Sequence, residues 1–132
     1  MAYISPTEAL TRFLSKEWKD TPVCYPNMPE PDLDDHKHWL QVWAFQSTSQ
    51  TSLDSSKRVT DQGLFYIDVT GEVDTGTGKF NRLASKLAKM LQCQLINGVS
   101  LQGARISPTQ GYDANGRYVV RVVVEYVVDY EF

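Results

Sequence analysis

The chain has 132 residues, 42% of them hydrophobic and 22% charged, and its formal net charge is −3. This length fits one domain with its own core, and this composition excludes an intrinsically disordered chain. The negative net charge argues against a protein whose whole surface binds nucleic acid, because such domains are usually basic.

The first predicted element is a helix that begins near the N-terminus. Ser5 is expected to cap it, with Pro6 at the first helical position and Glu8 completing a capping box. Apolar residues then recur at helical spacing on one side: Leu10, Phe13, Leu14 and Trp18. The pattern predicts an amphipathic helix that ends before Pro22.

Two strands and two loops are expected next. Residues 23–25 predict a short strand, and residues 26–35 form a proline-spaced acidic loop. Residues 38–47 predict a strand with apolar side chains on both faces. Residues 48–62 are polar and charged with almost nothing to bury, so we expect a long mobile loop there.

The middle of the chain predicts a strand followed by a helix. In the strand, residues 63–70, Phe65, Ile67 and Val69 alternate with Leu64 and Tyr66, which therefore belong to opposite faces. A glycine-rich connection leads into a helix over residues 79–92 whose apolar side chains recur at i, i+3 and i+4.

The C-terminal part predicts a turn and two strands. Asn97 and Gly98 are a tight-turn signal before a strand at residues 99–106, and residues 107–116 are expected to form a turn-rich loop. Residues 118–130 predict a long strand with one wholly apolar face. That strand would span about 43 Å, more than the roughly 36 Å diameter of a compact domain of this size, so it must bend, bulge or project.

Together these elements predict an α+β fold: a two-layer sandwich in which two helices cover one face of a mostly antiparallel twisted sheet of four to five strands, with residues 1–132 as a single domain. Two helices cover about 20 Å of sheet width, which is about the width of such a sheet. The second face would stay bare although it carries apolar side chains, part of them in the 39–45 strand. Bare apolar area of this size usually marks an interface. The candidate interface residues on this face are Leu64, Tyr66, Val119, Val123 and Val127.

Charged residues suggest a second candidate surface. Four cations, Lys79, Arg82, Lys86 and Lys89, lie on the polar side of the 79–92 helix. Such a stripe fits nucleic acid phosphates or an acidic protein surface, and it is also typical of a solvated helix face. The loop that contains Asp34 and Asp35 is one acidic candidate partner.

The sequence offers no catalytic, metal or cofactor site. The glycine-rich segment 71–80 fails as a phosphate loop, because Val73 and Phe80 stand where Gly and Ser or Thr are needed. His36 and His38 fall on one side of a strand, but Lys37 separates them and no further ligand cluster is nearby. We therefore expect a protein that is not an enzyme and has no metal and no cofactor.

The N-terminus and the cysteines suggest a cytoplasmic origin. The first ten residues, MAYISPTEAL, lack the basic and apolar regions of a signal peptide, and no apolar run approaches the roughly 20 residues that cross a bilayer. Cys24 and Cys93 fit no metal or redox spacing and are expected to be ordinary thiols. We therefore expect a soluble protein without membrane contact.

The order of these elements resembles the tail terminator-like proteins of long-tailed bacteriophages, relatives of the lambda-type tail terminator. The likeness lies mainly in GLFYIDVT, followed by GTG and an amphipathic helix, and in the final NGRYVVRVVVEYVVDY. The resemblance implies a hexameric ring that caps the tail tube, ends tail polymerisation and presents a head-attachment surface. The implied partners are other copies of the chain, the tail tube protein and a head-completion or connector protein, with DNA at most passing through the ring. The implied location is the virion, after assembly in the host cytoplasm.

Two alternatives remain open. Other head–tail joining proteins and minor tail proteins share the same broad architecture. A nucleic-acid-binding module that uses the basic face of the 79–92 helix belongs to a different functional class.

Overall fold

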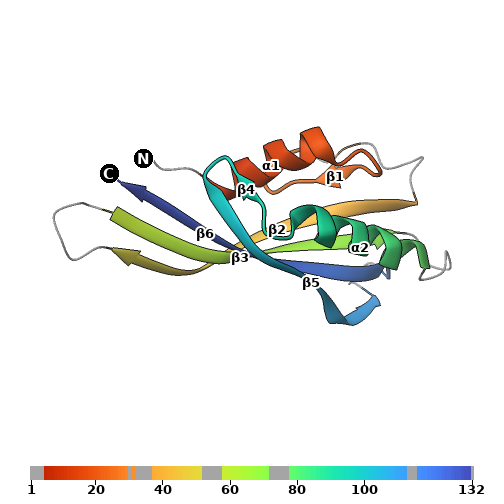
Figure 1. The fold of residues 1–132 in the computed structure, drawn as a ribbon. Helices are drawn as coiled ribbons and strands as arrows, with labels where there is room; N and C mark the ends of the chain where they lie inside the picture. The colour runs from red at the N-terminus through yellow and green to blue at the C-terminus, as the bar shows by residue number, and fades with distance from the viewer. Residues whose placement is uncertain are drawn as a thin grey trace.

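The computed structural model describes residues 5–29, 31, 37–51, 58–71, 78–112 and 116–131, without the side chains of residues 47 and 108–110. Within these ranges the chain forms two helices and six strands. Figure 1 shows α1 and α2 on the same side of a curled sheet. The elements are α1 (Pro6–Glu17), β1 (Val23–Cys24), β2 (His38–Thr51), β3 (Arg58–Gly71), α2 (Gly78–Leu91), β4 (Leu95–Ile96), β5 (Val99–Tyr112) and β6 (Tyr118–Glu131).

The sheet corrects the predicted fold class. Its strand order is β1-β2-β3-β6-β5-β4, with β1 parallel to β2 and every other pair antiparallel. The prediction of a two-layer sandwich with four to five strands is wrong, because the sheet is a curled half-barrel and strands make up 55% of the chain. The reason is that several polar segments continue as strands where loops are predicted.

The largest such correction concerns residues 48–62. The predicted loop is instead the far end of β2 and the start of β3, paired from Thr48 and Gln62 to Thr51 and Val59, while residues 52–57 lie outside the described part. Polar side chains support the ladder, since the Ser49 hydroxyl donates to Asp61 over 2.6 Å. In Figure 1 these ends of β2 and β3, together with the end of β6, project beyond the helices as a three-stranded arm.

β5 explains much of the curl. It runs to Tyr112, through part of the turn-rich loop that the sequence predicts for residues 107–116. Its register against β6 shifts twice, between Leu101 and Ala104 and between Ile106 and Gln110. Irregularities of this kind increase strand twist and bend the strand, so the sheet curls instead of lying flat.

β2 contains a single extra residue at its middle. Gln46 pairs with Gly63, whereas Thr48 pairs with Gln62, so residue 47 is left over. Side chains alternate between faces along a strand, and one inserted residue shifts that alternation by one position. The helix-facing side chain opposite Phe65 is therefore Ala44, whereas the one opposite Asp61 is Ser49.

The core lies between the helices and one face of the sheet. The predictions for both helices are confirmed: the Ser5 hydroxyl accepts from the Glu8 N–H over 3.3 Å, and α2 agrees with the predicted range within one residue at each end. The Asn97–Gly98 turn is confirmed by its positive φ angles of 46° and 86°. The most deeply buried side chains include Leu10, Leu14, Leu40, Phe65, Ile67, Val69, Phe80, Leu87, Leu91, Val120, Val122 and Val124.

Candidate interaction surface

The sheet face turned away from α1 and α2, here called the outer face, carries a row of large apolar side chains. Residues directly opposite each other in an antiparallel ladder point to the same face. Trp43 pairs with Tyr66, and Tyr66 pairs with Val123, while Phe45 pairs with Leu64. Trp43 is 45% exposed and Phe45 is 48% exposed. Two of the largest side chains of β2 therefore face solvent on the side that neither helix covers.

An aromatic and cationic cluster organises this face. The Phe45 and Tyr66 rings pack with centroids 5.0 Å apart, and the Arg121 guanidinium lies 4.5 Å over the Tyr66 ring. Arg121 also donates two hydrogen bonds to the buried Asp68 carboxylate. That hydrogen bond raises the pKa of Arg121, against an opposing effect of burial. Because the cation and the carboxylate neutralise each other, the surrounding surface behaves as an apolar patch with an internal ion pair.

The predicted outer-face residues are brought together in this region. Leu64, Tyr66, Val119 and Val127 are half-buried on the outer face, whereas Val123 is buried between its ladder neighbours Tyr66 and Arg105. Local sequence does not single out Trp43 and Phe45, because their strand is apolar on both sides. Their pairing with Tyr66 and Leu64 is the signal that assigns them to this surface.

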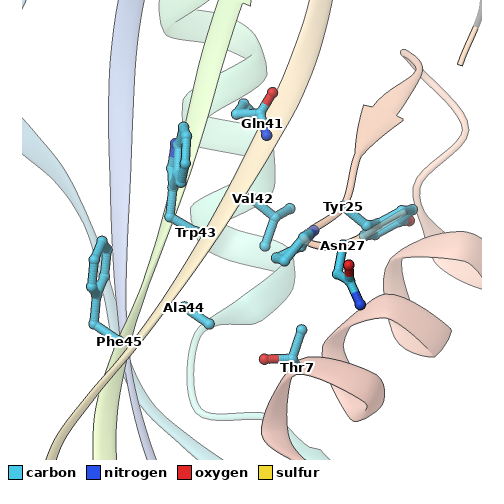
Figure 2. A pocket seen from close by; sticks show the side chains of 9 residues that line it. Thr7, Tyr25, Asn27, Gln41, Val42, Trp43, Ala44 and Phe45 are labelled. Carbon is cyan, nitrogen blue, oxygen red and sulfur yellow. The ribbon is translucent and has the colours of Figure 1, made fainter. Parts of the chain in front are cut away.

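The outer face ends at an open edge of β2. β1 pairs only with Leu40 and Gln41, and beyond Gln41 none of the described strands continues on this side. A groove of about 500 Å³ runs along this edge, lined by Thr7, Tyr25, Pro26, Asn27 and residues 41–45. Figure 2 shows Trp43 and Phe45 projecting from β2 on the side away from Thr7, Tyr25 and Asn27.

Tyr25 forms one wall of that groove. Its hydroxyl lies 3.2 Å from the Ser15 hydroxyl, which joins the end of β1 to α1. Burial raises the pKa of Tyr25, and the hydrogen bond with Ser15 opposes this effect. None of the residues that line the groove is an acid, a lysine, an arginine or a histidine.

The predicted basic stripe of α2 is divided in the structure. Lys86 donates to the Asp20 carboxylate over 2.7 Å and lies 5.6 Å from the centre of the Trp18 ring, so it connects α2 to the end of α1. Lys79, Arg82 and Lys89 are exposed and form no ion pair with the rest of the described chain. The proposed acidic partners Asp34 and Asp35 lie outside the described residues.

The other candidate sites receive no support from the described residues. Within those ranges no three His, Cys, Asp or Glu side chains gather where a metal could bind. His38 packs edge-on against Phe80, with ring centroids 4.6 Å apart, and His36 lies outside the described part. Cys24 is buried and Cys93 is exposed, and neither forms a disulfide in the described part of the chain. None of the helices described is long and apolar enough to cross a membrane.

Comparison with known proteins supports the fold alone. No protein-family model and no curated protein matches the sequence. One solved structure superposes with a TM-score of 0.62 over 95% of this chain and 91% of that chain, at 14% sequence identity. The name of that protein states no function. At this low identity, the superposition shows that the two folds are similar, and it carries no information about function.

Proposed function

We propose that the chain is a structural subunit of a phage tail, which assembles with copies of itself into a closed ring, caps the tail tube and provides the surface for head attachment. The single observation that carries this proposal is the uncovered apolar outer face, with Trp43, Phe45, Leu64 and Tyr66 side by side. Soluble monomers rarely leave a continuous apolar patch of this kind in water, and such patches usually mark interaction sites.

The projecting arm supports the same proposal. Beyond the pair of Val99 and Val128, β5 no longer accompanies β6, so the arm consists of β2, β3 and β6 alone. Arg58 reaches Glu131 across its end over 3.5 Å, and the Thr60 hydroxyl donates to Asp129. An arm with bare strand edges is prone to pair with other chains unless a specific neighbour covers it. In a ring, each arm would lie against the body of the next subunit.

The tail role comes from the resemblance of the sequence to tail terminator-like proteins, and it requires a functional test. Purified chain added to tail tube protein during polymerisation should shorten the tubes and leave a ring at one end, as seen by negative-stain electron microscopy. The substitution Leu64→Lys places a charge in the outer face and should abolish the capping. Leu95→Lys is the matched control, because Leu95 is already 74% exposed on β4. A chain that stays strictly monomeric at all concentrations, even with tubes present, would refute the proposal.

A nucleic-acid-binding role is the second candidate, favoured by the three exposed cations Lys79, Arg82 and Lys89. The pairing of Lys86 with Asp20 removes one charge from the stripe and weakens this alternative. If it holds, DNA binding should fall steeply with salt and should be lost in an Arg82→Glu/Lys89→Glu variant. Absence of DNA binding at low salt eliminates it.

A further inference from the structure

The charges of the chain are unevenly distributed along its sequence. Residues 78–112 contain five lysines and arginines and no aspartate or glutamate. Because the whole chain has a formal net charge of −3, the remaining residues together carry −8. The basic segment forms α2, β4 and β5, and α2 packs on β5. The surface of α2 and β5 is therefore positive on a protein that is otherwise acidic.

A groove on this surface brings two of the cations together. It lies between α2 and β5 and has a volume of about 380 Å³. Lys89 and Arg105 line it, and both are exposed and form no ion pair with the described part of the chain. Ala88, Ala104 and Ile106 add apolar side chains, and Ile106 is 37% exposed. Phosphates would neutralise the cations of this basic groove but leave Ile106 in water, whereas an acidic protein surface with an apolar residue covers both.

A matching acidic surface lies at the end of the arm. Asp129 and Glu131 are exposed and, like the half-buried Val127, occupy odd-numbered positions of β6, so all three belong to the outer face. Asp129 accepts a hydrogen bond from the Thr60 hydroxyl, which leaves its charge in place, and Glu131 lies 3.5 Å from Arg58 at an exposed site. The acidic end of the arm, Asp129 and Glu131, is thus continuous with the apolar outer face.

One copy cannot bring its own acidic end to its own groove. Arg105 lies opposite Val123 on β6, and Asp129 follows six residues farther along that strand, a distance of about 20 Å. Glu125 is nearer to Arg105, but the two side chains form no ion pair. In Figure 1 the arm projects at one end of the sheet, whereas α2 lies toward the other end. The acidic end is therefore available to the groove of another molecule.

We propose that the acidic end of the arm of one copy docks in the basic groove of the next copy. Asp129 then lies between the partner's Lys89 and the partner's Arg105. Val127 covers the partner's Ile106. The contact uses side chains alone, so it needs no free strand edge. Because exposed ion pairs are individually weak, we expect it to form at high protein concentration and to dissociate on dilution.

This docking rests on the proposed ring and names two surfaces through which neighbouring subunits meet. The arm and the basic groove are different surfaces, so the contact is heterologous. A heterologous contact repeats from copy to copy and gives a ring when the rotation closes. Each subunit would use its arm on one neighbour and its groove on the other.

Carbodiimide cross-linking tests the contact on the unmodified chain. The reagent joins a carboxylate to a lysine amine that lies against it, with loss of water. In a mixture of unlabelled and nitrogen-15-labelled chain, the tryptic peptide with Lys89 should be linked to the peptide that begins at Val122, in pairs that combine both isotopes. Lys16 is the control lysine, because it is exposed on α1 outside the groove. Linked pairs of a single isotope, or equal linking of Lys16, overturn the proposal.

Charge reversal with rescue provides an independent measurement. Asp129→Lys reverses the arm, and Lys89→Glu/Arg105→Glu reverses the groove. By light scattering, each variant alone should be monomeric at concentrations where the unmodified chain is assembled. Their equal mixture should assemble, because reversed arms then meet reversed grooves, and this rescue excludes a folding defect. Lys16→Glu should assemble like the unmodified chain. A mixture of folded variants that stays monomeric overturns the docking.

The outcomes separate this contact from the tail role. Tube capping by the Lys89→Glu/Arg105→Glu variant overturns the docking and leaves the ring proposal standing. Cross-linking and rescue without tube capping support the docking and refute the tail role. If the groove variant assembles normally but loses DNA binding, the groove is a nucleic acid site and the docking is overturned.

Discussion

Arg121 and Asp68 lie directly opposite each other on β6 and β3 and form a two-pronged ion pair, with N···O distances of 2.8 and 3.1 Å. The residue Asp68 is only 7% exposed, so its carboxylate depends on this partner for its hydrogen bonds. The guanidinium also covers the Tyr66 ring. One arginine thus stabilises a buried acid and shields an aromatic side chain on the outer face.

Removing Arg121 should therefore destabilise the fold measurably. We expect Arg121→Ala to cost about 1–3 kcal/mol, because it leaves a buried carboxylate without its charged partner. Arg12→Ala is the matched control. Arg12 forms an exposed i,i+4 pair with Glu8 at 2.6 Å, and such pairs contribute about 0.5 kcal/mol or less. Urea denaturation measures both changes, and equal losses would contradict the assigned role of Asp68.

Gly63 should not tolerate a side chain. A Cβ atom at this position would overlap the carbonyl oxygen of Phe45 and the phenol oxygen of Tyr126. The first of these is backbone in the neighbouring strand and cannot move aside without breaking the ladder. We expect Gly63→Ala to cost at least about 2 kcal/mol through overpacking. Gly103→Ala should be nearly neutral, because a Cβ there meets no atom within 4 Å. Thermal unfolding of the two variants distinguishes these cases.

Lys86 should contribute to the contact between the two helices. It joins the Asp20 carboxylate and approaches the Trp18 ring, whereas Lys89 on the same helix forms no ion pair within the described ranges. Lys86→Met should cost about 0.5–1 kcal/mol, as expected for a partly exposed ion pair with an added cation–π contact. Lys89→Met should leave the free energy of unfolding unchanged. Identical unfolding curves for the two variants would show that the Asp20 contact adds nothing.

Tyr25 should make the stability of the fold sensitive to alkaline pH. Burial raises its pKa in the folded chain, while in the unfolded chain its hydroxyl titrates near its usual value of about 10. A raised folded pKa gives a stabilising contribution that is complete below the unfolded pKa and is lost as pH rises through the folded pKa. The stability difference between the unmodified chain and Tyr25→Phe should therefore be constant up to about pH 9 and then shift against the unmodified chain. Parallel urea-denaturation profiles from pH 8 to 11 would contradict this prediction.

The sequence predicts well those elements that carry their own signals. Ser5 and Pro6 define the start of α1, the apolar spacing defines α2, and Asn97–Gly98 defines the turn between β4 and β5. The alternation in β6 predicts the burial of its even-numbered side chains from Val120 to Val128, whereas Val123 on the other face is also buried. In each case the information lies within a few neighbouring residues.

The strands that no local pattern predicts depend on partners far along the chain. Two segments with few apolar residues become strands, Thr48–Thr51 and Arg58–Gln62. They do so because they pair with each other and because the second of them also pairs with β6. Their interactions include Ser49 with Asp61 and Thr60 with Asp129, which no local pattern reveals. The candidate surface was predicted in part for the same reason: Leu64 and Tyr66 were assigned to it by alternation, whereas Trp43 and Phe45 needed the register of β2.

The extra residue in β2 also determines how the surface of this strand must be redesigned. Before the insertion, the odd-numbered residues Trp43 and Phe45 point away from the helices, whereas beyond it Ser49 points toward the helix side. A charged side chain on the outer face therefore requires an odd-numbered position before residue 47. After residue 47, in the arm, it requires an even-numbered position such as 48 or 50. Deleting residue 47 would restore a single parity, and with Thr48 still opposite Gln62 each side chain of the arm would stay on its present face.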